Sequence, residues 1–113
     1  MVGTMQTQVM ADFYEKVLQK PADMKEDNWY GWLIGNCFMS IGEHSEAPGM
    51  AKEPARIIIN FETTDVKKEF DRIKALGATV VKEPYEMGSM HIATFADPDG
   101  NYFQLMTPWN EEK

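Results

Sequence analysis

The chain has 113 residues, of which 43% are hydrophobic and 26% are charged. This length suits one domain and is short for two, and the composition is that of an ordinary globular chain. No apolar run approaches the roughly 20 residues that a membrane-spanning helix needs. We therefore expect a single domain over residues 1–113.

The charge of the chain argues against several partners. Eleven Lys and Arg against eighteen Asp and Glu give a net charge of -7, which repels phosphate backbones and anionic lipids. We expect neither nucleic acid nor a membrane as a partner, whereas an acidic surface attracts small cationic molecules. The lone Cys37 excludes an internal disulfide, and the first residues lack the features of a signal peptide, so we expect a cytoplasmic protein.

The first half of the chain predicts a strand, a helix and three more strands. A short alternating segment at 2–8 precedes apolar residues at helical spacing, and this helix should end before Pro21. The helical stripe consists of Met10, Phe13, Tyr14, Val17 and Leu18. Three strands are expected at 22–27, 28–34 and 37–42. The Gly35-Asn36 pair predicts a hairpin turn between the last two.

The second half predicts the same order of elements. Residues 44–55 carry Gly and Pro among mixed charges and are expected to link module one, about 1–43, to module two, about 56–108. A β-branched strand at 57–62 precedes a helix that Thr64 or Asp65 can cap and Gly77 can end. The expected later strands lie at about 78–83, 90–96 and 101–107. The chain therefore reads as βαβββ written twice, with Gly35 to Met39 aligned on Gly100 to Gln104.

Three segments carry a family resemblance. They are Phe13-Tyr14-Glu15-Lys16-Val17-Leu18, Lys74-Ala75-Leu76-Gly77-Ala78 and the run from Phe95 through Asp97-Pro98-Asp99-Gly100-Asn101 to Leu105. Over residues 3–108 the chain resembles the vicinal oxygen chelate superfamily, which includes glyoxalase I, extradiol dioxygenases, and fosfomycin- and bleomycin-resistance proteins. The resemblance implies an α+β fold of two βαβββ modules, with curled mixed sheets around a concave cleft, helices on the convex side, and a homodimer.

The resemblance also implies where a metal would bind, because the metal-dependent members place His, Glu or Gln at four concave positions. The final-strand Glu of those enzymes falls on Gln104, and its repeat mate falls on Met39. The fifth-strand His falls on Ile58, and at the loosely aligned first strand Gln6 or Gln8 can approach. Neutral amides alone hold a divalent ion weakly. We therefore expect no metal and no other cofactor, as in the bleomycin-resistance type, with a divalent metal ion as the alternative.

Strand alternation predicts the rest of the cleft if Met39, Gln104 and Ile58 face it. Side chains expected on the same concave faces are Cys37, Ile41, Asn60, Glu62, Tyr102 and Met106. Side chains expected under the helices are Phe38, Ile57, Ile59, Phe61, Phe103 and Leu105. Tyr30 and Trp32 should share one face, where they either hold a planar or cationic ligand or fill the core or a dimer contact.

The remaining polar candidates each have a plain structural alternative. His91 is either a general base or a packed or surface residue. His44 is either a metal chelator or part of a solvated loop. Asp97 and Asp99 are either paired carboxylates or residues of a hairpin turn, and Cys37 reads most simply as a small packing residue.

The sequence thus predicts a protein that sequesters a small organic molecule in its cleft, without metal and with no assigned catalytic residue. Glu62 would favour cationic groups on that molecule. The predicted ligand-binding residues are Tyr30, Trp32, Met39, Glu62, His91, Tyr102 and Gln104. The alternatives are a metal-dependent lyase, isomerase or dioxygenase of the same superfamily, and a protein–protein adaptor.

Overall fold

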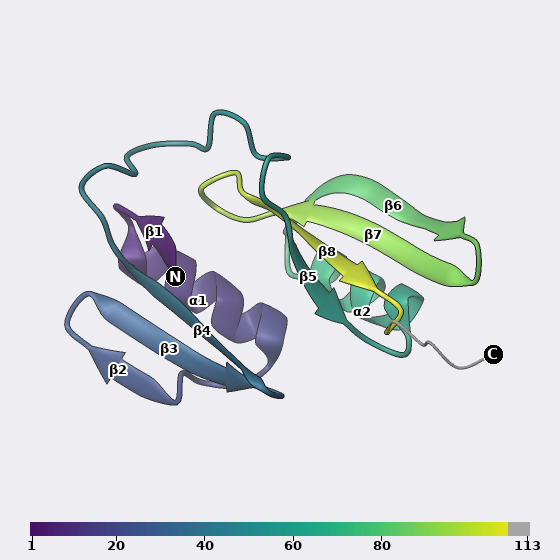
Figure 1. Ribbon diagram of the computed structural model, residues 1–113, viewed down its shortest axis with the longest axis horizontal. Helices are drawn as coiled ribbons and strands as arrows, with labels where there is room; N and C mark the ends of the chain where they lie inside the picture. The colour runs from purple at the N-terminus through teal and green to yellow at the C-terminus, as the bar shows by residue number, and fades with distance from the viewer. Residues whose placement is uncertain (109–113) are drawn as a thin grey trace. The chain divides into compact units, whose positions relative to one another are not determined.

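A computed structural model describes residues 1–108 of the chain (Figure 1). The chain divides into two compact units, one from Met1 to Ala51 and one that begins at Lys52. This boundary falls inside the segment expected to be a linker. We call the two units module one and module two and describe each by itself. No helix of the described residues is long and apolar enough to cross a membrane.

Module one contains one helix and a four-stranded sheet. Its elements are β1 (Val2–Thr4), α1 (Thr7–Leu18), β2 (Met24–Glu26), β3 (Trp29–Ile34) and β4 (Cys37–Glu43). The strand order is β1-β4-β3-β2, with β1 parallel to β4 and the other pairs antiparallel. Gly35, at φ +57°, opens the two-residue turn between β3 and β4 as predicted.

Module two repeats this arrangement. Its elements are β5 (Ile59–Glu62), α2 (Val66–Ala75), β6 (Thr79–Met87), β7 (Met90–Ala96) and β8 (Tyr102–Met106). The strand order is β5-β8-β7-β6, with β5 parallel to β8. The predicted α+β fold of two βαβββ modules with mixed sheets is therefore confirmed.

The helices form where the apolar stripes predict them. In α1 the side chains of Met10, Tyr14 and Val17 are buried. The carboxylate of Asp65 caps α2 by accepting a hydrogen bond from the Lys68 backbone N–H at 3.1 Å. Gly77, at φ +94°, follows α2 in a conformation that side chains rarely adopt.

Aromatic rings fill the space between α2 and its sheet. Phe70 of α2 stacks on Phe95 with ring centroids 5.1 Å apart, and Phe95 stacks on Phe103 at 5.6 Å. Phe61 meets Phe103 edge to face at 5.8 Å, and Leu105 is buried. The predicted placement of Phe61, Phe103 and Leu105 on the helix side is thus confirmed, and each sheet has a second face, here called its open face, that its own helix leaves uncovered.

In module one the predicted faces were wrong by one residue. Trp32 lies opposite Met39, and Tyr30 lies opposite Ile41. Tyr30 bonds to α1, and Met39 and Ile41 are buried on that side. Phe38, expected under the helix, lies instead on the open face and is 43% exposed. Cys37 consequently points to the helix side of the sheet, as Met39 and Ile41 do, and not to a concave face.

The error has a geometric cause in the lengths of the two hairpin loops. The turn between β3 and β4 has two residues, because Ile34 pairs with Cys37. The loop between β7 and β8 has five, because Ala96 pairs with Tyr102. Aligning the two Gly-Asn pairs therefore shifts the alternation of β4 by one residue, which moves each side chain to the other face. Ile57 was also misplaced, since it precedes β5 and is 78% exposed.

Candidate functional site

The open face of module two carries the main group of predicted site residues. Strand pairing places Asn60 beside Gln104 and Glu62 beside Met106. Alternation along β8 adds Tyr102 to the same face. Glu62, Tyr102 and Gln104 therefore share one sheet face, as the sequence predicted, and Ile58, one residue before β5, has the same parity.

A row of four polar side chains crosses this face from edge to edge. Gln104 lies opposite Thr94, and Thr94 lies opposite Lys82. The amide nitrogen of Gln104 donates to the Thr94 hydroxyl at 3.3 Å. We call this set, which consists of Asn60, Gln104, Thr94 and Lys82, the polar row. Its middle carries the partly exposed Gln104 amide and the buried Thr94 hydroxyl, and the ammonium group of Lys82 lies at the β6 edge.

A less polar row runs beside it. Glu62, Met106, Ile92 and Tyr85 follow one another across the four strands. The Lys82 ammonium nitrogen lies 5.5 Å from the centroid of the Tyr85 ring. Sequence reasoning missed Thr94, Lys82 and Tyr85, because their placement depends on the pairing of β6 and β7 and not on a motif.

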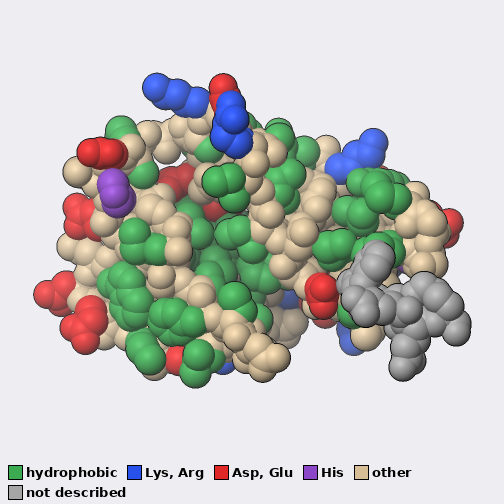
Figure 2. All heavy atoms as spheres, in the orientation of Figure 1, with side chains coloured by type: hydrophobic (Ala, Val, Ile, Leu, Met, Phe, Trp, Pro, Cys, Tyr) green, Lys and Arg blue, Asp and Glu red, His purple; other side chains and the backbone are tan. Residues whose placement is uncertain are grey.

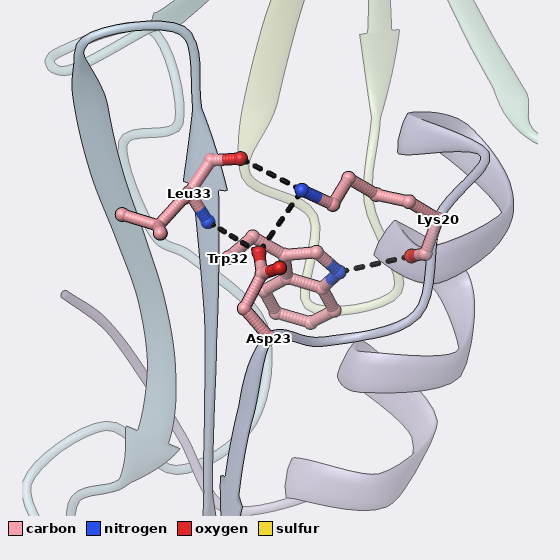
Figure 3. A network of polar contacts seen from close by, with 4 residues as sticks. All are labelled: Lys20, Asp23, Trp32 and Leu33. Atoms are coloured by element: carbon pink, nitrogen blue, oxygen red, sulfur yellow. Dashed lines mark hydrogen bonds and ion pairs between the residues drawn. The ribbon is translucent and has the colours of Figure 1, made fainter.

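Trp32 is held in the core of module one by a network around the end of α1 (Figure 3). Its indole N–H donates to the Lys20 carbonyl at 3.1 Å, and the side chain is 1% exposed. The Asp23 carboxylate accepts from the Leu33 N–H at 2.7 Å and pairs with Lys20 at 3.0 Å. The Lys20 ammonium also donates to the Leu33 carbonyl. Trp32 therefore fills the core, one of the alternatives expected for it. The expected position of Met39 on a concave face was wrong, because Met39 is buried on the same side as Trp32.

The same network perturbs one titratable group. The hydrogen bond from the Leu33 backbone N–H, followed by the hydrogen bond from Lys20, lowers the pKa of Asp23 below its ordinary value of 3.8. This carboxylate joins the end of β3 to the segment after α1.

Tyr30 borders a separate hollow in module one. The hollow has a volume of about 570 Å³ and is lined by Thr7, Gln8, Lys25, Glu26, Asp27, Asn28 and Tyr30. The Tyr30 hydroxyl donates to the Gln8 side-chain oxygen at 2.9 Å. Lys25 extends over the Tyr30 ring. Tyr30 also stacks on Trp32, with centroids 6.5 Å apart, so the predicted shared face is confirmed although it is the helix side.

His91 is not grouped with Gln104. Its side chain points to the same side of β7 as those of Ala93 and Phe95, which is the helix side. It is exposed, because it lies near the start of the strand. Its ring nitrogen lies 3.4 Å from a carboxylate oxygen of Glu86. This pair lies at the end of the β6–β7 hairpin, away from the polar row.

Asp97 and His44, two other polar candidates, form hydrogen bonds within their own loops. One oxygen of Asp97 accepts from the backbone N–H groups of Asp99 and Asn101, both at 2.9 Å, which fixes the loop between β7 and β8. His44 accepts from the Glu46 N–H within its own turn. Cys37 is exposed.

The open face of module one is largely apolar, with Glu26 at its β2 edge. Met24, Trp29, Leu33 and Phe38 share it, and the rings of Trp29 and Phe38 lie 5.9 Å apart. Figure 2 shows hydrophobic side chains gathered over the strands of this module. Leu33 is 53% exposed. Trp29 was recognisable from the sequence as an aromatic candidate. Phe38 was not, because the alternation of β4 was assigned one residue out of register.

The side chains at the superfamily's metal positions do not fit a divalent ion. Gln104 supplies only a neutral amide that already bonds to Thr94, and Ile58 has no donor atom. Among residues 1–108 no three His, Cys, Asp or Glu side chains converge as a metal site would require.

Comparison with known proteins agrees with the fold. Residues 1–106 match the family described as "Glyoxalase-like domain". The chain is 41% identical over 46 residues to the uncharacterized protein YurT of Bacillus subtilis, an alignment that covers 41% of the chain and 36% of YurT. The chain therefore aligns with only about a third of that relative's length.

Solved structures give the same result over nearly the whole chain. A glyoxalase/bleomycin resistance protein/dioxygenase family enzyme from Burkholderia phytofirmans is 23% identical with a TM-score of 0.76, covering 94% of this chain and 93% of its own. The fosfomycin resistance protein FosX from Mesorhizobium loti is 19% identical with a TM-score of 0.73, covering 96% and 91%. These identities show a shared fold alone. With the family match over residues 1–106, the chain belongs to the glyoxalase-like domain family, within the vicinal oxygen chelate superfamily.

Proposed function

We propose that the protein binds and sequesters a small organic molecule, aromatic or cationic, without using a metal. The supporting observation is Gln104. This neutral amide stands on the open face of module two, bonded to Thr94, at the position where the superfamily's metal enzymes carry a carboxylate. An amide and a hydroxyl recognise the polar groups of an organic ligand, whereas they bind a divalent ion poorly.

The surroundings of Gln104 suit such a ligand. Met106, which is partly exposed, supplies apolar surface beside the polar row, next to the buried Ile92, and Tyr102 adds a partly exposed ring. Glu62, exposed on β5, attracts a cationic group. A few polar groups among apolar side chains are typical of small-molecule sites.

Fluorescence titration with two aromatic probes tests this proposal. N-phenyl-1-naphthylamine is neutral and proflavine is cationic, and both are titrated in the presence of EDTA. We expect binding in EDTA and weaker binding by Gln104→Ala, while Asn36→Ala, which removes an exposed amide of module one, binds as the unmodified protein does. If the unmodified protein binds neither probe, the proposal is contradicted.

The alternative is a metal-dependent lyase, isomerase or dioxygenase of the same superfamily. Native mass spectrometry before and after incubation with nickel, zinc and manganese separates the two functions. A metal-free protein that retains an organic adduct supports sequestration. One metal per site, with probe binding lost in EDTA and restored by that metal, supports the alternative.

The proposal includes a cytoplasmic homodimer. A single exposed cysteine suits a reducing compartment. The apolar open face of module one, with Leu33 and Phe38 exposed, is the surface that we propose for contact with a second copy.

A further inference from the structure

The edge strand β6 contains two irregularities that change which side chains reach the open face of module two. Its pairing with β7 shifts register between Val80 and Lys82 and again between Lys82 and Tyr85. Val80 lies opposite Phe95 on the helix side. Without the first shift Lys82 would lie on that side too, and without the second shift so would Tyr85. The first shift therefore turns Lys82 to the face that carries Gln104, and the second keeps Tyr85 on that face beside it, as bulges beside binding sites do.

The charge of Lys82 is free to meet a ligand. Its side chain is exposed, and among residues 1–108 no carboxylate forms an ion pair with it. The Tyr85 ring, 5.5 Å away, holds the ammonium group by a cation–π contact. Thr94 lies directly across from Lys82, with Gln104 on the next strand. One cation and two neutral hydrogen-bonding groups thus stand in line.

The opposite edge of this face carries the opposite charge. Glu62 stands on β5, three strand spacings or roughly 14 Å from β6. The face is therefore polarised, with a carboxylate at one edge and an ammonium group at the other. In a protein with a net charge of -7, binding of an organic anion requires such a local cation.

We infer that Lys82 binds a carboxylate-like anionic group of the sequestered molecule, which is accordingly dipolar, with any cationic group toward Glu62. This inference rests on the proposed function and names the chemistry of its ligand. Lys82 donates charge-assisted hydrogen bonds to the anion, and the partly exposed Gln104 amide, supported by Thr94, binds polar atoms next to it. A lysine on an edge strand can also serve only to prevent edge-to-edge pairing, and the experiment separates these roles.

The experiment uses two probes that share one ring system. 8-Anilinonaphthalene-1-sulfonate carries a sulfonate, which stands in for the carboxylate, and N-phenyl-1-naphthylamine lacks it. We expect Lys82→Gln to weaken binding of the sulfonate probe about fivefold, as for a solvent-exposed ion pair, and to leave the neutral probe within twofold. Lys82→Arg should retain the binding of both probes.

Lys68→Gln is the matched control, because it removes the same charge from the exposed surface of α2. An unchanged affinity of Lys82→Gln for the sulfonate probe overturns the inference, as does an equal loss for both probes or an equal loss in Lys68→Gln. In each of these cases the proposed function stands as long as the unmodified protein binds the neutral probe. If the unmodified protein binds neither probe, the proposed function fails and the inference with it. Circular dichroism and the melting temperature verify that each variant is folded.

Discussion

Trp32 on β3 and Met39 on β4 lie directly opposite each other, on the face of the first sheet that α1 covers. Trp32 is 1% exposed and Met39 is 9% exposed. The indole N–H is also satisfied by the Lys20 carbonyl. Both residues thus belong to the core of module one, and the aromatic surface of the open face comes from Trp29 and Phe38 instead.

Replacing Trp32 should therefore change stability first. We expect Trp32→Ala to lower the free energy of unfolding by about 3 to 5 kcal/mol, the usual cost of removing a large buried side chain. Urea denaturation followed by circular dichroism measures it. Trp29→Ala, which truncates a partly exposed ring of the same strand, serves as the control and should cost less. Equal losses in the two variants would contradict the core assignment.

Asp23 should make the stability of module one depend on acidity. Its pKa is lowered in the folded protein by the Leu33 N–H and by Lys20, so the ionised form is favoured by folding. A depressed pKa gives stabilisation that is complete above the ordinary value of 3.8 and is lost as the pH falls through the lower folded value. The unmodified protein should exceed Asp23→Asn in stability at pH 7, and this advantage should be smaller at pH 3.

The matched control for this measurement is Asp71→Asn, which removes an exposed carboxylate of α2 that pairs with Lys67. Chemical denaturation at both pH values gives the comparison. The same pH trend in the two variants would show an effect of net charge and not of the Asp23 contacts.

The sequence predicted the faces of module two correctly because the residue from which the alternation was counted, Gln104, does lie on the open face. Counting alternate residues from Gln104 placed Tyr102 and Met106 on one face and Phe103 and Leu105 on the other, and strand pairing agrees. The same count failed in β4, since it started from a turn with two residues where the other module has five. The length of the hairpin loop decides which side chains of the next strand face the helix, and a shift of one residue exchanges the two faces.

The β6 residues could not be predicted in this way. Their faces depend on two register shifts against β7, and a bulge is a property of a strand pair and not of one strand's pattern. Lys82 reads in the sequence as a residue near the end of a short strand. Tyr85 lies beyond the strand predicted at 78–83, because Pro84 normally interrupts a regular strand.

Asp97 should matter for folding and not for ligand binding. One of its oxygens accepts backbone hydrogen bonds from Asp99 and Asn101, and the side chain is 4% exposed. Asp97→Ala leaves those donors without this acceptor, so we expect a loss of about 1 to 3 kcal/mol in a urea titration. Asp71→Ala, an exposed control, should change stability by less than about 1 kcal/mol.

A loop role for Asp97 also predicts that the folded variant binds N-phenyl-1-naphthylamine as the unmodified protein does. Strongly weakened binding by a folded Asp97→Ala protein would point instead to a direct role in the site.

The apolar open face of module one makes a prediction about assembly. Leu33 and Phe38 pair across β3 and β4 and are 53% and 43% exposed. If a second copy covers them, Phe38→Asp buries an unpaired charge in the contact and should convert the dimer to a monomer. Val9→Asp is the control, because Val9 is similarly exposed on α1 and should leave the dimer intact. Native mass spectrometry reports both masses directly. A monomeric unmodified protein would rule out the dimer, whereas a Phe38→Asp variant that remains dimeric would place the contact on another surface.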